Sequence, residues 1–189
     1  LTTPIYETST FVFESARGVE RYQDGTLCAY LYSRYENPTI VAAEEKIAAV
    51  DGAEAALVFS SGMAAISTAL VSLLNAGDEV VCAAAIYGGT FHLLEHLLPR
   101  FGVARRFVSL EQLATPDRII GPKTKVLWFE SRINPTLRCV DIRTIAEACR
   151  AAGVISAIDN TFASPINQQP LPMGVDLSVQ SVTKDLNGH

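Results

Sequence analysis

The chain has 189 residues, of which 49% are hydrophobic and 19% charged, a composition that excludes a disordered protein and suffices for one well-buried domain. The formal net charge of -5 and the pI of 5.2 provide no basic surface for nucleic acid or for an anionic membrane. No apolar stretch approaches the roughly 20 uncharged residues that a membrane-spanning helix requires.

The cysteines and the first residues bear on the compartment. Cys28, Cys82, Cys139 and Cys149 have no CxxC spacing, and residues 1–6 do not have the pattern of a signal peptide. We therefore expect reduced thiols and a cytoplasmic protein. The expected partners are a small-molecule substrate and further copies of the chain, with no nucleic acid and no membrane.

The N-terminal part of the chain is predicted to differ from the rest. Residues 1–35 show little helical or strand periodicity and indicate an extended arm. A helix then follows, because Asn37 has the side chain of an N-cap and Pro38 suits the first helical position. Asp51 and Gly52 are predicted to end that helix.

From there on, strand-like apolar runs alternate with helical patterns. The runs cover residues 55–59, 79–83, 104–108, 125–129, 154–158 and 176–179. The helical patterns cover residues 63–74, 91–101 and 142–152. This alternation predicts an α/β fold with a mostly parallel sheet between helices.

Lys184 follows the last of these runs. It lies where the chain leaves the sheet, at the edge where α/β folds place ligands. A lysine there can be partly desolvated, which favours its neutral, nucleophilic form. Ser181 and Thr183 place two hydroxyl groups beside it. From this segment alone, a surface lysine in a polar turn is the alternative.

Two segments carry groups that suit a phosphate. Residues 60–63 (Ser-Ser-Gly-Met) join a strand-like run to a helix, whose first free amides attract an anion, although simple helix capping explains the same residues. Tyr32 and Arg34 offer a phenol and a planar guanidinium, although Arg34 can instead form a surface ion pair with Glu36.

Asp159 and Tyr87 each follow a predicted strand. The carboxylate of Asp159 can keep a pyridine nitrogen protonated, or it can cap the next turn. Tyr87 can stack on a flat heteroaromatic ring and move a proton, or it can pack at the sheet edge.

Together, residues 32–39, 60–63, 87–90, 159–161 and 181–184 resemble, in order and spacing, the Cys/Met metabolism family of pyridoxal-phosphate (PLP) enzymes. This family includes cystathionine γ-synthases, cystathionine γ- and β-lyases, methionine γ-lyases and O-acetylhomoserine sulfhydrylases. The resemblance runs from residue 3 to residue 189. It implies pyridoxal 5'-phosphate as cofactor and the large domain of the PLP-dependent transferase fold type I, with an extended N-terminal arm.

The resemblance also implies roles for individual residues. Lys184 holds PLP covalently and then moves the substrate's α-proton, while Asp159 pairs with the ring nitrogen. Tyr87 stacks on the ring and donates a proton to the leaving group. Asn134, in a further matching motif at residues 130–136, bonds the cofactor's 3-oxygen.

The implied phosphate site draws on two chains. The amides of Gly62 and Met63 and the hydroxyls of Ser181 and Thr183 come from one subunit. Tyr32 and Arg34 reach in from the neighbouring subunit, within a homotetramer built from dimers that share active sites. Residues 1–35 are accordingly expected to form the arm and residues 36–189 the PLP-binding domain, with the C-terminal domain of the family absent.

The implied reaction is elimination or replacement at the γ-carbon, or less commonly the β-carbon, of sulfur-related amino acids such as cystathionine, O-acylhomoserine or methionine. A non-catalytic PLP-binding scaffold is the main alternative. Ser181 and Lys184 also fit the SxxK signature of serine acylases, without that family's other motifs. His92 and His96 are four residues apart, but lack a third ligand, so no metal site is expected.

Four positions depart from the family pattern. Gln180 stands where a histidine is usual, Asp185 where an aromatic residue is usual, and Arg132 where a proline is usual. Gly89 occupies the cysteine position of methionine γ-lyases, which disfavours that member of the family.

Overall fold

The computed structural model describes residues 3–187, which pack as two compact units. Within the described residues, the N-terminal unit comprises residues 3–49 and 54–58, and the sheet unit comprises residues 50–53 and 59–187. Residues 36–49 pack with the N-terminal unit. Each unit is described by itself.

The N-terminal unit contains helix α1 (Ala16–Gln23), which the expectation of an extended arm did not include. Ser15 caps this helix, since its side-chain oxygen accepts a hydrogen bond from the Gly18 amide at 3.2 Å. The helix buries none of its residues. Gly18, Val19 and Tyr22 form a half-buried side of this helix, which the expectation of an arm with little periodicity overlooked.

Helix α2 (Pro38–Asp51) begins and ends as predicted. The side-chain oxygen of Asn37 accepts a hydrogen bond from the Thr39 amide at 2.8 Å, and Pro38 occupies the first helical position. Gly52 follows the helix with a φ of 66°, in the left-handed region that favours glycine.

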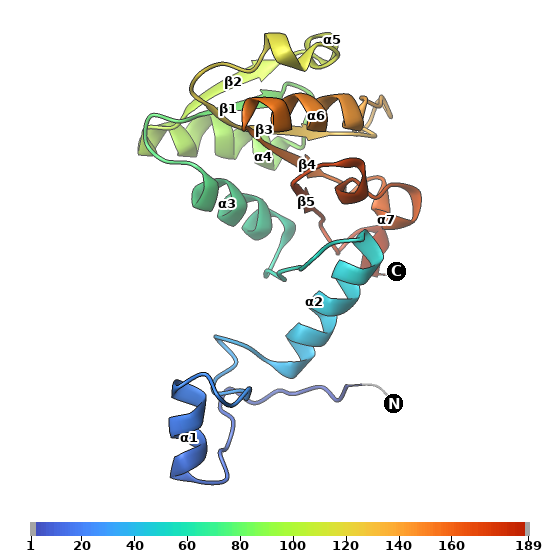
Figure 1. Cartoon of the computed structure of the whole chain (residues 1–189). Coiled ribbons are helices and arrows are strands. Elements are labelled where there is room, and N and C mark those ends of the chain that lie inside the picture. Colours follow the sequence, from blue (N-terminus) through green and yellow to red (C-terminus); the bar gives the residue numbers. More distant parts are fainter. Residues whose placement is uncertain (1–2, 188–189) are drawn as a thin grey trace. The chain divides into compact units, whose positions relative to one another are not determined.

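The sheet unit is built on five parallel strands in the order β2-β1-β3-β4-β5 (Figure 1). The strands are β1 (Glu79–Ala83), β2 (Ala104–Val108), β3 (Thr124–Glu130), β4 (Ile155–Asp159) and β5 (Leu177–Val179). All five were predicted to within one residue at each end, and the parallel α/β architecture is confirmed.

The sixth predicted strand, residues 55–59, is wrong. These residues form no strand in the described part of the chain, and Leu57 is 76% exposed. The amide of Val58 donates to the Glu44 side chain at 2.9 Å rather than to a neighbouring strand. An apolar run needs a strand partner to become part of a sheet, and the local sequence cannot show whether that partner exists.

Helices cover both faces of the sheet. On one face lie α3 (Gly62–Leu73) and α4 (Gly88–His92), the latter continued by a π-helical segment (Leu93–Leu97) and a 3₁₀ turn (Leu98–Phe101). On the other face lies α6 (Ile142–Ala152) (Figure 1). Shorter elements connect these parts: α5 (Leu110–Leu113), α7 (Ser164–Asn167) and 3₁₀ turns at Pro116–Arg118, Leu171–Met173 and Asp185–Asn187.

The alternation of side chains along β3 decides which residues reach the site. Trp128 packs in the core beneath α3 and α4, whereas Phe129 packs in the core beneath α6, and both are fully buried. Because successive side chains point to opposite faces, Glu130 emerges on the α3 and α4 side at the carboxyl end of the strand. Asp159, its neighbour in the register of β4, emerges on the same side.

Among the described helices, none is long and apolar enough to cross a membrane.

Candidate active site

The carboxyl edge of the sheet carries two neighbouring acidic side chains, at the last residues of β3 and β4. Glu130 and Asp159 are direct partners in the parallel register of these strands. Glu130 is buried, with 7% of its surface exposed, and Asp159 is half-buried. Two carboxyl groups at adjacent strand ends repel each other when both are charged, so their protonation states are linked.

Asp159 is held by the turn that follows it. Its Oδ1 accepts a hydrogen bond from the Thr161 amide at 3.0 Å. Burial raises the pKa of Asp159 above its usual value, while hydrogen bonds from the side chain and the backbone of Thr161 act in the opposite direction. In the described residues no lysine or arginine forms an ion pair with this carboxyl group. A cationic ligand would therefore find a prepared acceptor.

Glu130 holds a more strongly shifted carboxyl group. Burial raises its pKa to about 7, the Tyr87 amide opposes this shift, and the charge of Asp159 adds to it. The Tyr87 amide donates to Oε1 of Glu130 at 2.6 Å. Tyr87 lies at the N-cap of α4, and the residue is 57% exposed.

Thr161 connects Asp159 to the end of β5. Its hydroxyl oxygen accepts a hydrogen bond from the Ser181 amide at 2.8 Å. Ser181 in turn packs against Gly62, the first residue of α3: a Cβ added to Gly62 would lie 2.9 Å from Cβ of Ser181 and 3.2 Å from its Cα. Only a glycine allows the two backbones to approach this closely.

The first turn of α3 presents free donors at this point. Ser61 caps the helix by accepting a hydrogen bond from the Ala64 amide at 3.1 Å. The preceding amides, those of Gly62 and Met63, lie in the turn that has no intrahelical acceptor. Together with the helix dipole, such amides form an anion site.

Gly89 closes the arrangement on the side of α4. A Cβ added to it would lie 2.6 Å from Cε1 of Tyr87 and 2.8 Å from Sδ of Met63. The Tyr87 ring and the Met63 side chain therefore meet over this glycine. The space that a side chain at residue 89 would need is therefore occupied by Tyr87 and Met63.

These contacts form a closed ring at one edge of the sheet. In order they join Gly62, Ser181, Thr161, Asp159, Glu130, Tyr87, Gly89 and Met63, which is adjacent to Gly62. The ring brings together five of the predicted site residues: Gly62, Met63, Tyr87, Asp159 and Ser181. They come from the carboxyl ends of the strands and the first turns of α3 and α4.

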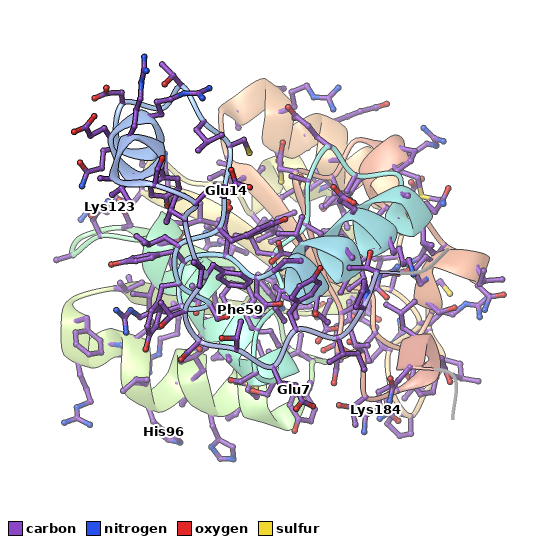
Figure 2. The ribbon with its side chains drawn as sticks, turned by 90° about the horizontal axis from the view of Figure 1, so that it is seen from below. Glu7, Glu14, Phe59, His96, Lys123 and Lys184 are labelled. Atoms are coloured by element: carbon purple, nitrogen blue, oxygen red, sulfur yellow. The ribbon has the colours of Figure 1, made fainter. Side chains whose placement is uncertain are left out.

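Lys184 stands on the turn next to this ring. Its amide donates to the Ser181 carbonyl at 3.1 Å, and its side chain, labelled in Figure 2, is exposed, as is Thr183. Lys184 was expected to be partly desolvated, but in this structure its side chain is exposed to solvent. The turn follows the last strand, and its outer side is open in the described chain.

Asn134 lies in the loop after β3 and is exposed. Arg132, in the same loop, is exposed and has a φ of 64°, a backbone conformation that is uncommon for a residue other than glycine. Neither side chain belongs to the ring of contacts. His92 and His96 stack at 5.4 Å on the outside of the sheet unit, and the described residues include no group of three or more metal-binding side chains.

Tyr32 and Arg34 lie in the N-terminal unit. The Arg34 guanidinium lies 4.5 Å from the ring centroid of Tyr32 and 5.4 Å from that of Tyr35. The alternative ion pair with Glu36 does not form among the described residues. Arg34 is exposed, so its cationic group is held by aromatic faces while remaining accessible.

Neither Thr161 nor Asp51 was predicted from the sequence to support the site, yet both accept hydrogen bonds from the segment that follows β5. Thr161 links Asp159 to Ser181, and the only signal was its place in the Asp-Asn-Thr motif. Asp51 is buried at the end of α2, and its Oδ1 accepts a hydrogen bond from Nε2 of Gln180 at 3.0 Å. The unusual glutamine therefore has a local purpose, because it satisfies a buried carboxyl group.

Comparison with known proteins identifies the family. The model of the family described as "Cys/Met metabolism PLP-dependent enzyme" matches residues 1–189. The chain belongs to this family. The fold type I architecture is therefore confirmed, and the chain comes from a family of PLP-dependent enzymes of cysteine and methionine metabolism.

Among curated relatives of this family, the L-methionine gamma-lyase of Fusobacterium nucleatum subsp. nucleatum is 43% identical over the whole chain, which covers 48% of that protein. The O-succinylhomoserine sulfhydrylase of Mycobacterium tuberculosis is 41% identical over 97% of the chain and 45% of its own length. The chain thus spans about half the length of the curated relatives it matches.

Solved structures agree. A Campylobacter jejuni protein described as an O-acetylhomoserine (thiol)-lyase, solved with N'-pyridoxyl-lysine-5'-monophosphate, matches with a TM-score of 0.90 at 34% identity. That match covers 100% of this chain and 47% of the other. Cystathionine gamma-lyase from Lactobacillus plantarum, complexed with L-serine, matches with a TM-score of 0.88 at 40% identity over 98% of this chain and 46% of its own.

Proposed function

We propose that this chain is the PLP-binding part of an enzyme that eliminates or replaces a group at the γ-carbon, or the β-carbon, of sulfur-related amino acids. The observation that carries the proposal is the closed ring of contacts at the sheet edge. It joins the first turn of α3, the exposed Tyr87 and the half-buried carboxyl group of Asp159, which forms no ion pair among the described residues. These are the groups that a phosphorylated pyridine requires.

The phosphate end of PLP fits the first turn of α3. The amides of Gly62 and Met63 donate hydrogen bonds there, and the hydroxyl groups of Ser181 and Thr183 lie on the facing turn. The close approach of Ser181 to Gly62 supports this role, since it brings both sets of donors to one point.

The ring nitrogen fits Asp159, whose carboxylate keeps it protonated. When bound, PLP supplies a sink for the negative charge that develops at the α-carbon of the substrate. The Asp159 carboxyl group accepts a hydrogen bond from the Thr161 amide, and its backbone belongs to β4, so its orientation is fixed before the ligand binds.

Three further residues of the chain act on the reacting groups. Lys184 would hold the cofactor covalently through Nζ, and once the substrate's amino group has displaced it, the freed Nζ would take up and return the α-proton of the substrate. Tyr87 stacks its exposed ring on the cofactor, and its hydroxyl donates a proton to the leaving group. Asn134, on the exposed loop after β3, donates a hydrogen bond to the cofactor's 3-oxygen.

Gly89 allows the position of Tyr87 to be tested. Gly89→Ala should fold normally, because the two groups that would clash with the new Cβ are the ends of flexible side chains. The Tyr87 ring or Met63 must then move, and we expect kcat/KM to fall by about tenfold to a hundredfold, as misplacement of a catalytic group does. Gly88→Ala is the control, because a Cβ at residue 88 meets nothing within 4 Å. Equal activity of the two variants would contradict the proposed position of Tyr87.

We also propose that residues 1–35 form an arm that completes the site of a neighbouring subunit. Tyr32 and Arg34 supply a phenol and an exposed guanidinium for the phosphate, within a homotetramer whose dimers share their sites. Residues 36–189 then form the PLP-binding domain. The reduced state expected for the cysteines supports a cytoplasmic location.

Shared sites predict complementation between two inactive variants of the full-length protein. In a hybrid dimer of Arg34→Ala and Lys184→Ala subunits, one of the two sites receives both intact groups. Mixing the variants should therefore restore activity in proportion to the hybrid dimers formed, which native mass spectrometry can count. Inactive hybrids would mean that Arg34 serves its own chain or no site at all.

The reaction itself is tested by assaying the full-length protein with PLP on cystathionine, O-acylhomoserines and methionine. We expect turnover of at least one of these substrates, with release or exchange of the γ-substituent detected by mass spectrometry. PLP bound without turnover of any sulfur-related amino acid would favour the non-catalytic scaffold.

A further inference from the structure

Glu130 has no role in the function proposed above, although it is more buried than Asp159. It lies at the end of β3 with 7% of its surface exposed, and its Oε1 accepts the Tyr87 amide at 2.6 Å. Glutamate is seldom buried to this extent without a charged partner. The described residues provide no ion pair for it.

The contact with Glu130 fixes the Tyr87 amide at the start of α4. Tyr87 lies at the N-cap of α4, where its side chain makes no capping hydrogen bond, and the residue is 57% exposed. Gly88 and Gly89 follow, and glycine leaves the main chain free to take several conformations. The hydrogen bond to Glu130 therefore decides from where the Tyr87 ring projects over the site.

The two carboxyl groups of the pair are not equivalent. Asp159 receives hydrogen bonds from Thr161 that favour its charged form. Glu130 has a pKa raised to about 7 by burial, to which the charge of Asp159 adds. The other titratable group facing Glu130 is Cys82 on β1, whose pKa is raised by burial and then by Glu130, so that it remains a neutral thiol. Below about pH 7, Glu130 is therefore the member of the pair that holds a proton.

We propose that Glu130, in its neutral form, is a positioning residue that anchors the main-chain amide of Tyr87. Because Glu130 is neutral, Asp159 is the charged member of the pair. The part that concerns Asp159 rests on the proposed function, because it assumes that Asp159 meets the ring nitrogen of PLP. The anchoring of Tyr87 does not depend on that assumption.

The test compares Glu130→Gln, which keeps the acceptor oxygen but cannot ionise, with Glu130→Ala, which lacks the acceptor. Glu147→Gln, at an exposed position on α6, is the control for loss of a carboxyl group. The full-length protein is used with and without PLP. The measurements are hydrogen exchange at the Tyr87 amide, the unfolding temperature against pH, and kcat and KM.

The sign of the pH effect follows from the raised pKa. Glu130 has a pKa of about 7 in the folded chain and an ordinary value of 4.5, so its stabilising effect is complete below about 4.5 and is lost as the pH rises through about 7. The wild-type protein should therefore lose stability relative to Glu130→Gln between about pH 4.5 and pH 7, with no further loss at higher pH. Glu147→Gln should follow the wild-type curve.

In Glu130→Gln the Tyr87 amide should stay protected and kcat should remain within about threefold of the wild type. In Glu130→Ala the Tyr87 amide should exchange about tenfold faster, as expected for one lost hydrogen bond, and kcat/KM should fall by a similar factor. Unchanged exchange in Glu130→Ala, or a Glu130→Gln variant as impaired as Glu130→Ala, would overturn the proposal. The proposed function is tested separately by measuring PLP binding to the wild type from its absorbance. The exchange of the Tyr87 amide and the pH dependence of stability are measured without PLP, so they do not depend on that result.

Discussion

Replacing Lys184 with alanine should abolish covalent attachment of PLP and lower kcat by on the order of a thousandfold or more, because one amine both holds the cofactor and carries the α-proton. The position of Lys184 supports this expectation. It lies on the turn after β5, next to the ring of contacts, and its exposed side chain forms no ion pair in the described chain. Borohydride reduction of the full-length protein with PLP, followed by peptide mass spectrometry, should locate the pyridoxyl group on Lys184.

Lys123→Ala is the matched control. Lys123 is an exposed lysine that immediately precedes β3, so it lies at the amino edge of the sheet, opposite to the site. This variant should bind PLP and turn over substrate like the wild type. A label on Lys46, Lys123 or Lys125, or a label that persists in Lys184→Ala, would refute the assignment of Lys184.

The sheet was predictable because each buried strand is a short apolar run between polar turns. In β3, for example, five consecutive residues from Val126 to Glu130 are buried, four of them hydrophobic. Parallel strands bring their carboxyl ends to one edge of the sheet, so the sequence also predicted that Asp159 and Lys184 lie at that same edge. Both predictions depend only on local pattern and on general rules of α/β architecture.

The contacts of the site were not predictable in the same way, because they join residues far apart in the chain. Tyr87 and Glu130 are separated by 43 residues, and Gln180 and Asp51 by 129. From the sequence, Gln180 was only a departure from the family pattern. Its hydrogen bond to Asp51 can be seen only in the folded chain. Residues 55–59 show the opposite error, since their local pattern suits a strand that does not form.

Removing the charge of Asp159 should cause the second large loss of activity. Asp159→Asn should retain the acceptor oxygen for the Thr161 amide, so the turn and the unfolding temperature should change little. The variant lacks the charge that keeps the ring nitrogen of PLP protonated. We expect kcat to fall by roughly a hundredfold or more, on the scale of losing a charged group that acts in the transition state. Asp159→Glu keeps the charge and should retain more activity than Asp159→Asn.

The comparison between these two variants separates the two roles that the sequence left open for Asp159. A residue that only caps the turn acts through Oδ1, which asparagine preserves and the longer glutamate displaces. A residue that acts on the cofactor needs its charge, which glutamate preserves and asparagine lacks. Near-normal kcat in Asp159→Asn, with a greater loss in Asp159→Glu, would therefore identify a structural cap. The reverse order, together with an altered absorption spectrum of bound PLP in Asp159→Asn, is the result we expect.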